Sequence, residues 1–254
     1  MMINKDIFSV VAISLLLMLP VFVHGKAIAG VVERLNVGKV ALTFDACETT
    51  TPSYFDEKIL QYLIKERIPF TIFMTGKFAN RNYRRLPEIA GLTFIEIENH
   101  SYNHYQHMEN LGAGDVWKEV TDLDELMRKM IGKGTKYFRF PAGNYDTRTL
   151  KLIENMNLKV VHWTFPSGDP DKNVTTSKLV NWVVSKTRQG DILIFHINGR
   201  GYKTGEALPV IITSLREKGI KFVKLEDGMI GGKGNERIAP FLLHRLPDGT
   251  LMVR

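Results

Sequence analysis

The sequence predicts a parallel α/β fold, and two observations carry that prediction. Short runs rich in β-branched and aromatic residues alternate with amphipathic stretches of helical period. Most of the short runs are almost continuously apolar, as expected of strands that are covered on both faces. No long linker, composition shift or internal repeat divides the chain, so we expect one main domain.

Seven strands are predicted, each reached through a helical crossover. They lie at 40–46 (VALTFDA), 70–76 (FTIFMTG), 92–98 (LTFIEIE), 136–142 (KYFRFPA), 158–164 (LKVVHWT), 191–197 (DILIFHI) and 220–226 (IKFVKLE). Helices are predicted at 54–67, 116–131, 147–156, 177–188 and 206–218. Pro52, Thr176 and Gly205 stand where helices would begin, and Gly219 stands where one would end.

Three segments are predicted along the chain. Residues 1–29 combine one early lysine, an apolar run and a small-residue end, which is the layout of a secretory signal peptide cleaved after Gly25 or Ala29. A retained membrane anchor is the alternative, because the run of roughly 17 apolar residues is near the lower limit for a span. Residues 30–225 form the main domain. The Gly-rich segment 226–254 is expected to be a short extension with a hairpin around LPDGT.

Net charge and cysteine content indicate which classes of binding partner and which cellular compartment suit this protein. The formal charge of +7 favours anionic polymers or surfaces, but Lys and Arg are scattered, without the dense basic run typical of nucleic-acid binding. The single cysteine, Cys47, cannot form an internal disulfide, so an exported domain would rely on its own core. We expect export to the periplasm or the exterior, and no stable membrane span once the signal is cleaved. The sequence does not indicate an oligomeric state.

Polar residues stand at the carboxyl ends of five predicted strands, where ligands bind in parallel α/β proteins. They are Asp45, His100, Arg139, Asp169 and His196. His100 and His104 are four residues apart, so on a helical turn both would project from one face and could bind one metal through imidazole nitrogens.

Five short motifs resemble, in order, those of the polysaccharide deacetylase (NodB-homology) family of carbohydrate esterases. They are TFDAC (43–47), HSYNH (100–104), RFPAG (139–143), SGDPD (167–171) and IFH (194–196). The resemblance covers roughly residues 40–225. It implies a distorted (β/α) barrel with about seven parallel strands, and metal-assisted hydrolysis of acetyl groups on sugars.

The resemblance also implies roles for individual residues. Asp45 matches the general base, with Arg139 as the partner that keeps it ionised. His196 matches the general acid, with Asp169 orienting its ring; Asp171 is a rival for that second role.

Three further residues are expected to face the substrate. In the family, the backbone N–H at the position of Ala142 points towards the oxyanion, in a loop shaped by Pro141 and Gly143. Tyr145 and Trp163 could supply apolar walls for an acetyl methyl group or a sugar ring.

One position departs from the family pattern. The first motif commonly carries two aspartates, a base and then a metal ligand, and here the second position is Ala46. A divalent metal, with zinc expected, could be held by His100, His104 and waters alone, or by a substitute ligand from His107, Glu48 or Cys47. A site without metal is the third alternative.

We therefore expect an exported hydrolase that removes N-acetyl groups from an amino-sugar polymer, such as peptidoglycan, a chitin-like chain or an exopolysaccharide. Two alternatives remain open. The same constellation would serve an O-acetyl glycan esterase, and Ala46 would suit a catalytically silent carbohydrate-binding relative. The partner in each case is an acetylated polysaccharide rather than a nucleic acid.

Overall fold

The computed structural model describes residues 30–230, 243–245 and 251–253, and within them seven parallel strands form one curled sheet. The strand order is β5-β4-β3-β2-β1-β6, and β7 pairs with the first residues of β1. This confirms the predicted distorted barrel of about seven parallel strands. The strands are β1 Val40–Ala46, β2 Phe70–Met74, β3 Ile95–Asn99, β4 Tyr137–Phe138, β5 Lys159–Val160, β6 Ile192–His196 and β7 Phe222–Val223.

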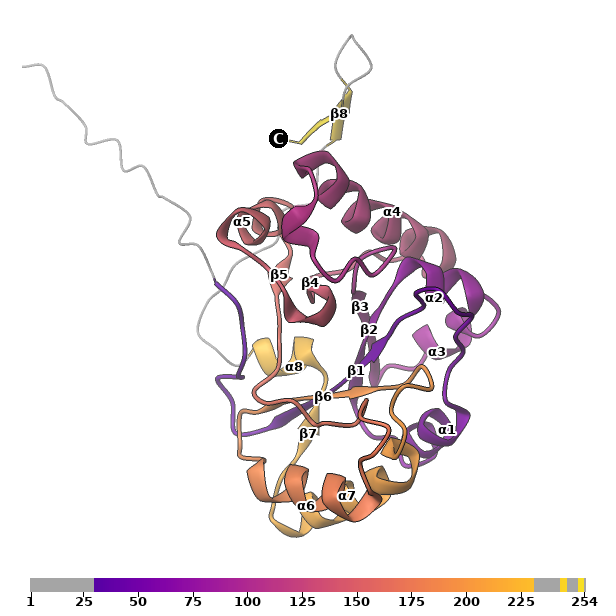
Figure 1. Ribbon diagram of the computed structural model, residues 1–254, viewed down its shortest axis with the longest axis vertical. Coiled ribbons are helices and arrows are strands. Elements are labelled where there is room, and N and C mark those ends of the chain that lie inside the picture. The colour runs from indigo at the N-terminus through magenta and orange to yellow at the C-terminus, as the bar shows by residue number, and fades with distance from the viewer. Residues whose placement is uncertain (1–29, 231–242, 246–250, 254) are drawn as a thin grey trace, which may run out of the picture.

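Helices surround the strands: α1, α6 and α7 lie at one end of the view in Figure 1, and α4 and α5 lie at the other. The helices are α1 Glu57–Lys65, α2 Gly76–Arg81, α3 Leu86–Ala90, α4 Ala113–Ile131, α5 Thr147–Asn155, α6 Thr176–Lys186, α7 Thr204–Glu217 and α8 Leu225–Met229. The predicted helices correspond to α1, α4, α5, α6 and α7. Helices α2, α3 and α8 were not predicted, because five or six residues are too short to reveal a helical period.

Helix boundaries shift from the predicted ones because particular side chains cap them. Asp56 accepts hydrogen bonds from the backbone N–H groups of Lys58 and Ile59, so α1 begins after Asp56 rather than near Pro52. Thr175 caps α6 in the same way, one residue before the predicted start. Gly219, with φ of +78°, follows the last turn of α7 as expected, since this left-handed conformation costs glycine little.

Strands β5 and β6 do not pair directly, and the segment before β1 lies across the gap. Val32 bridges to Val161 just after β5, and Arg34 bridges to Asp191 just before β6. A third bridge joins Phe165 to Leu193. The N-terminal segment of the described chain therefore completes the wall that the seven strands leave open.

Apolar side chains fill two layers on either side of the sheet. An inner cluster inside the curl includes Phe73, Tyr137, Ile192 and Leu225. A larger outer cluster packs the other face of β1, β2 and β6 against the helices and includes Phe44, Phe70 and Phe195. Side chains alternate between the two faces of a strand. This is why Phe44 lies outside the barrel and Asp45 lies inside it.

Two buried carboxylates of β3 lie on the same face of that strand. Glu98 accepts hydrogen bonds from the backbone N–H groups of Lys136 and Tyr137, so it ties β4 to β3. Glu96 accepts from the Thr71 hydroxyl and the Glu226 backbone N–H. Burial and then the neighbouring charge of Glu96 raise the pKa of Glu98 well above its ordinary value, and burial also raises the pKa of Glu96.

The two ends of the chain are only partly described. The expected signal segment 1–29 lies outside the described residues, as does much of 226–254. Within that extension the structure contains α8 and a two-stranded antiparallel sheet of β8 (Leu243–Arg245) and β9 (Leu251–Val253). Among the described helices, none has the length and apolar character needed to cross a membrane.

Glu98→Gln is expected to stabilise the fold at neutral and alkaline pH. A buried carboxyl group with a raised pKa favours the folded state fully below the unfolded pKa of about 4.3, and this contribution is lost as the pH rises through the folded pKa. The amide oxygen of Gln can still accept both backbone hydrogen bonds. We expect a gain of at least about 1 kcal/mol, or about 2–4 °C in Tm, at pH 8 and little gain at pH 4.5.

Thermal unfolding followed by circular dichroism at both pH values measures this difference. Glu125→Gln, at an exposed position of α4, is the matched control and should shift Tm at neither pH. A Tm change for Glu98→Gln that is the same at pH 4.5 and pH 8 would contradict a raised pKa for Glu98 in the folded state.

Candidate active site

The carboxyl ends of β1, β3, β4 and β6 bring four of the predicted residues to one end of the barrel. Asp45 lies near the end of β1, next to His196 of β6 in the parallel register and next to Phe73 of β2. His100 follows the last residue of β3, and Arg139 follows the last residue of β4.

A fully buried ion pair lies at the centre of this group. The Arg139 guanidinium donates through Nη1 to Asp45 Oδ1 at 2.7 Å. It also donates through Nε to the Val161 carbonyl and through Nη2 to the His162 carbonyl. Its planar group lies 3.9 Å from the centre of the Phe73 ring. All three guanidinium nitrogens are therefore hydrogen-bonded, and the charge is neutralised by one carboxylate.

Asp45 is held as a carboxylate by its neighbours. Burial alone would raise the pKa of Asp45, but the His100 ring and the Arg139 guanidinium together outweigh burial and lower the pKa below its ordinary value. Arg139 binds Oδ1 of Asp45, and the other oxygen, Oδ2, lies 3.4 Å from His100 Nε2. Asp45 therefore keeps one oxygen directed at the imidazoles.

The tautomer of His100 follows from its hydrogen bond. Its Nδ1 lies 2.8 Å from the Arg139 carbonyl oxygen, which can only accept, so Nδ1 carries the hydrogen. Nε2 then presents a lone pair, and it is buried without a hydrogen-bond partner. Burial is the main cause that lowers the pKa of His100 and keeps the ring neutral. A backbone carbonyl that fixes the tautomer in this way is typical of a metal-ligating histidine.

His104 lies beside His100, but not through the helical turn that the spacing predicted. The rings are 5.0 Å apart between centroids, and the segment between them is an irregular loop. Ser101 and His104 both adopt left-handed conformations, with φ of +65° and +61°, and the Ser101 hydroxyl accepts from the His104 backbone N–H. The helical prediction is wrong, because this tight turn replaces the helix. Burial, and then the repulsion that a protonated His100 ring would exert, lower the pKa of His104 to about 3.

The two histidines fit a divalent metal. Both rings are neutral, and both have a buried nitrogen without a hydrogen-bond partner, Nε2 of His100 and Nδ1 of His104. Neutral imidazole is the form that binds zinc and related metals. The chain could therefore offer two nitrogen ligands to a metal beside the Asp45 carboxylate.

A third protein ligand is not evident near this pair. Ala46 is fully buried, and its methyl group packs in the outer apolar cluster. Among the described residues, no group of three or more His, Cys, Asp or Glu side chains is arranged to hold a metal. The residues present suit the alternative in which two imidazoles and waters hold the ion.

The three substitute ligands that the sequence suggested are engaged elsewhere. Glu48 forms a two-pronged ion pair with Arg81. The His107 side chain is 62% exposed and pairs with Glu109. Cys47 is buried and receives a hydrogen bond from Asn198 Nδ2 to its sulfur at 3.2 Å. Burial, with the charge of Asp45, raises the pKa of the Cys47 thiol to about 11, which disfavours the thiolate that metals require.

A second acid–base pair lies on the neighbouring strand. His196 Nδ1 lies 2.9 Å from Asp169 Oδ1, and the other Asp169 oxygen accepts from the His196 backbone N–H and the Thr204 hydroxyl. Burial alone would lower the pKa of His196, but the hydrogen bond and charge of Asp169 outweigh burial and raise it. Asp171 takes no part, since it is exposed and accepts from the Asn173 backbone N–H.

The expected substrate-facing residues form one wall near Arg139. Ala142 adopts a left-handed conformation, with φ of +54°, in the short 3-10 turn η2 Pro141–Gly143. Trp163 packs closely over this turn, since a Cβ added to Gly143 would lie 2.8 Å from the indole. Tyr145 is 40% exposed and stacks on Phe140. Tyr145 and Trp163 therefore lie around the loop that contains Ala142.

Four residues of this region were missed by the sequence reading. Phe73 and His162 belong to apolar strand runs, in which nothing marks them as neighbours of an arginine. The Asn198 amide comes from the loop after β6, and the Thr204 hydroxyl comes from the first residue of α7, where that loop ends. The only available signal was the position of that loop at a strand end, where ligand-facing residues gather.

Comparison with known proteins places this site in a family. The polysaccharide deacetylase family matches residues 33–161, just over half of the chain. A bifunctional xylanase/deacetylase of Pseudobutyrivibrio xylanivorans is 27% identical over 192 residues, covering 76% of this chain but only 30% of that protein. A peptidoglycan-N-acetylglucosamine deacetylase of Bacillus cereus is 26% identical and covers 74% of this chain and 86% of its own.

The fold is shared with solved structures of the same group. A CE4 family pseudoenzyme from Bacillus anthracis superposes with a TM-score of 0.68 at 23% identity, over 78% of this chain and 68% of that one. At this identity the likeness concerns the fold alone. The family match and the fold together show that the chain belongs to the polysaccharide deacetylase family.

Proposed function

We propose that this protein is a hydrolase that removes N-acetyl groups from the amino sugars of a glycan. The observation that carries the proposal is the Asp45 carboxylate, held ionised by Arg139 and next to two neutral imidazoles, with the His196–Asp169 pair on the adjacent strand. Amide hydrolysis needs a base for the attacking water and an acid for the leaving amine. Asp45 and His196 have opposite protonation preferences, which suit these two tasks.

His100 and His104 would hold a divalent metal, with zinc as the expected ion because both ligands are imidazole nitrogens. Such an ion supplies Lewis-acid polarisation of the acetyl carbonyl and lowers the pKa of water. The remaining chemistry falls to the side chains of the chain itself.

Asp45 Oδ2 takes a proton from the water that attacks the acetyl carbonyl carbon, since Oδ1 is committed to Arg139. The backbone N–H of Ala142 would stabilise the oxyanion that forms, as the family motif implies. His196, charged and oriented by Asp169, gives its proton to the amine as the carbon–nitrogen bond breaks. The products are acetate and a free amino sugar. Tyr145 and Trp163 would line the acetyl or sugar face of the site.

We also propose export and an envelope or extracellular glycan as substrate. The layout of residues 1–29 supports export, and the names of the relatives support the substrate class: one is named for peptidoglycan N-acetylglucosamine and another for xylan degradation and deacetylation. Release of acetate from N-acetyl groups leaves amines on the polymer. O-acetyl esters would fit the same groups, and they would need the acid His196 less, because an alkoxide leaves without protonation more readily than the anion of an amine does.

A second candidate function is glycan binding without turnover. Ala46 is the observation that favours it, because a weakly held metal would leave the water poorly activated. The likeness to a solved pseudoenzyme supports only the shared fold. Against it stands the intact arrangement of Asp45, Arg139, Asp169 and His196, for which glycan binding alone provides no reason.

Asp45→Asn and His196→Ala are each expected to lower acetate release about 10²- to 10⁴-fold, because each removes one proton-transfer group. Acetate released from N-acetylglucosamine oligomers, with and without added Zn²⁺ or Co²⁺, measures the effect. Asp45→Asn also leaves the buried Arg139 without its counter-charge, so thermal unfolding must accompany the assay.

Glu125→Gln is the control and should retain full activity. No acetate from wild-type protein on any N- or O-acetylated glycan, with equal glycan binding by wild type and Asp45→Asn, would instead support the binding function.

Ala46→Asp is expected to bind Zn²⁺ about tenfold or more tightly than wild type, because it supplies the carboxylate that the family's first motif commonly provides as a metal ligand. The new side chain has to turn from the outer apolar cluster towards the imidazoles at the end of β1. Without metal the buried carboxylate should destabilise the fold, since the methyl group it replaces packs among apolar side chains. Metal binding would then restore Tm by linkage. Isothermal titration with Zn²⁺ and thermal unfolding measure both effects.

Ala46→Asn is the matched variant, with the same size and no charge. It should show the loss of Tm without the gain in affinity. Equal Zn²⁺ affinity in all three proteins would argue against a metal site at this position.

Asp169→Asn is expected to lower the pKa of His196, because the charge that outweighs burial is removed. Histidine ring titration by NMR measures the pKa directly. Asp171→Asn changes an exposed carboxylate of the same loop and should leave the pKa of His196 unchanged. The reverse outcome would assign the orienting role to Asp171.

A further inference from the structure

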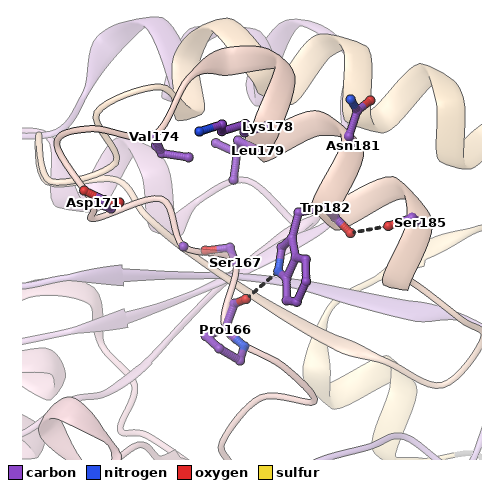
Figure 2. A pocket seen from close by; sticks show the side chains of 10 residues that line it. Pro166, Ser167, Asp171, Val174, Lys178, Leu179, Asn181, Trp182 and Ser185 are labelled. Carbon is purple, nitrogen blue, oxygen red and sulfur yellow. Dashed lines mark hydrogen bonds between the residues drawn. The ribbon is translucent and has the colours of Figure 1, made fainter.

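We propose that the groove between the loop Pro166–Asp171 and helix α6 is a second carbohydrate-binding site, which holds a distant sugar unit of the same polymer. The inference rests on the proposed function, since it takes a glycan as the ligand. The groove is open to solvent and has a volume of about 700 Å³, within the range of roughly 300–1,000 Å³ that is usual for small-molecule sites. Figure 2 shows the loop on one side and α6 on the other, with Trp182 between them.

Trp182 is the main apolar surface of the groove. The residue is 43% exposed, although an indole is among the side chains that gain most from burial. Its ring is nevertheless fixed: Nε1 donates to the Pro166 carbonyl at 2.9 Å, as Figure 2 shows, and Phe165 meets it edge-on at 6.5 Å. The Lys186 ammonium lies 4.7 Å from the ring centre, over one of its two faces. A rigid, partly exposed ring can bind with little loss of side-chain entropy.

Polar groups surround this apolar surface. Asp171, Lys178, Asn181 and Ser185 line the groove and are all exposed, while Leu179 and Val174 lie beneath them. A pyranose ring has an apolar face of C–H groups and a rim of hydroxyls. It therefore matches an aromatic ring with carboxylate, amide and hydroxyl partners at the edges.

The charges favour a neutral ligand. Asp171 and Lys178 line the groove and Lys186 lies over the Trp182 ring, so only one positive charge is in excess, short of the basic cluster that an anionic polymer or a membrane surface would require. A protein partner is usually recognised by a larger contiguous apolar face than one indole with small aliphatic neighbours. An uncharged N-acetylated sugar satisfies both conditions.

The groove shares its loop with the candidate active site. Ser167 lines the groove, and its hydroxyl donates to Asp169 Oδ1, the oxygen that also holds His196. Asp169 is fully buried between the two sites. A polymer bound at both positions would gain from the high effective concentration of its second unit, whereas a short oligomer would occupy only one.

Trp182→Ala tests this site in the full chain. Its KM for long, acetylated chitin chains is expected to rise roughly three- to tenfold, while its kcat and its KM for the N-acetylglucosamine dimer stay unchanged. Trp182→Phe keeps an aromatic ring, so its KM for the long chains should stay close to that of the wild type. Tyr83→Ala removes a comparably exposed aromatic residue, 52% exposed, elsewhere on the surface. It should leave the KM for both substrates unchanged.

Binding is measured separately from turnover, in Asp45→Asn protein. N-acetylglucosamine hexamer should quench or shift the tryptophan fluorescence, and the additional Trp182→Ala change should remove the part of that response due to Trp182, leave the part due to Trp163 in the active site, and weaken binding by isothermal titration. Trp182-dependent binding without any acetate release by wild type would reject the proposed function and keep this site. Acetate release with equal KM values for Trp182→Ala and wild type on the polymer, or self-association through Trp182 without glycan binding, would overturn the second site.

Discussion

The buried ion pair between Arg139 and Asp45 is the interaction on which the rest of the candidate site depends. Arg139 has no exposed surface, and burial of an unpaired guanidinium would cost several kcal/mol. Its side chain reaches β1 through Asp45 and the segment after β5 through the carbonyls of Val161 and His162. Its own carbonyl then fixes the ring of His100. One residue thus joins three strands and sets the tautomer of a candidate ligand.

The ion pair with Arg139 has two opposing effects on Asp45 as a base. The charge of Arg139 keeps Asp45 ionised in spite of burial, and a carboxylate with a lowered pKa is a weaker base for the same reason. Activation of water therefore has to come partly from the imidazole side, where Oδ2 and His100 Nε2 lie 3.4 Å apart. The two halves of the site are complementary. Arg139 keeps Asp45 as a permanent carboxylate anion, and the two histidines supply nitrogen lone pairs for a cation.

The sequence predicted the parts of this structure that follow from periodicity and failed where single side chains override it. The strands β1, β2 and β6 are apolar on both faces and were found within a few residues. In contrast, β4 and β5 are only two residues long, and the Arg139 side chain just beyond β4 is placed by tertiary contacts, such as its hydrogen bond to the His162 carbonyl, that no strand period reveals. Glu96 and Glu98 were hidden in a strand pattern, since a carboxylate inside a barrel is not expected without its tertiary hydrogen bonds. The His100–His104 spacing fits a helix, but the Ser101 hydroxyl stabilises a left-handed turn instead.

The replacement at Ala46 has a consequence for the charge of the site. Asp45 is balanced by Arg139, and the raised pKa of His196 favours the protonated ring that would balance Asp169, so with His196 protonated these four groups sum to zero. A divalent cation held by two neutral imidazoles would bring a charge that no protein ligand offsets. Its affinity would be low, but the same uncompensated charge would act more strongly on a water or an acetyl oxygen beside it. Under the proposed function, Ala46 in place of a carboxylate would weaken retention of a metal while making the bound ion a stronger Lewis acid, and it would leave Asp45 and His196 in place as base and acid.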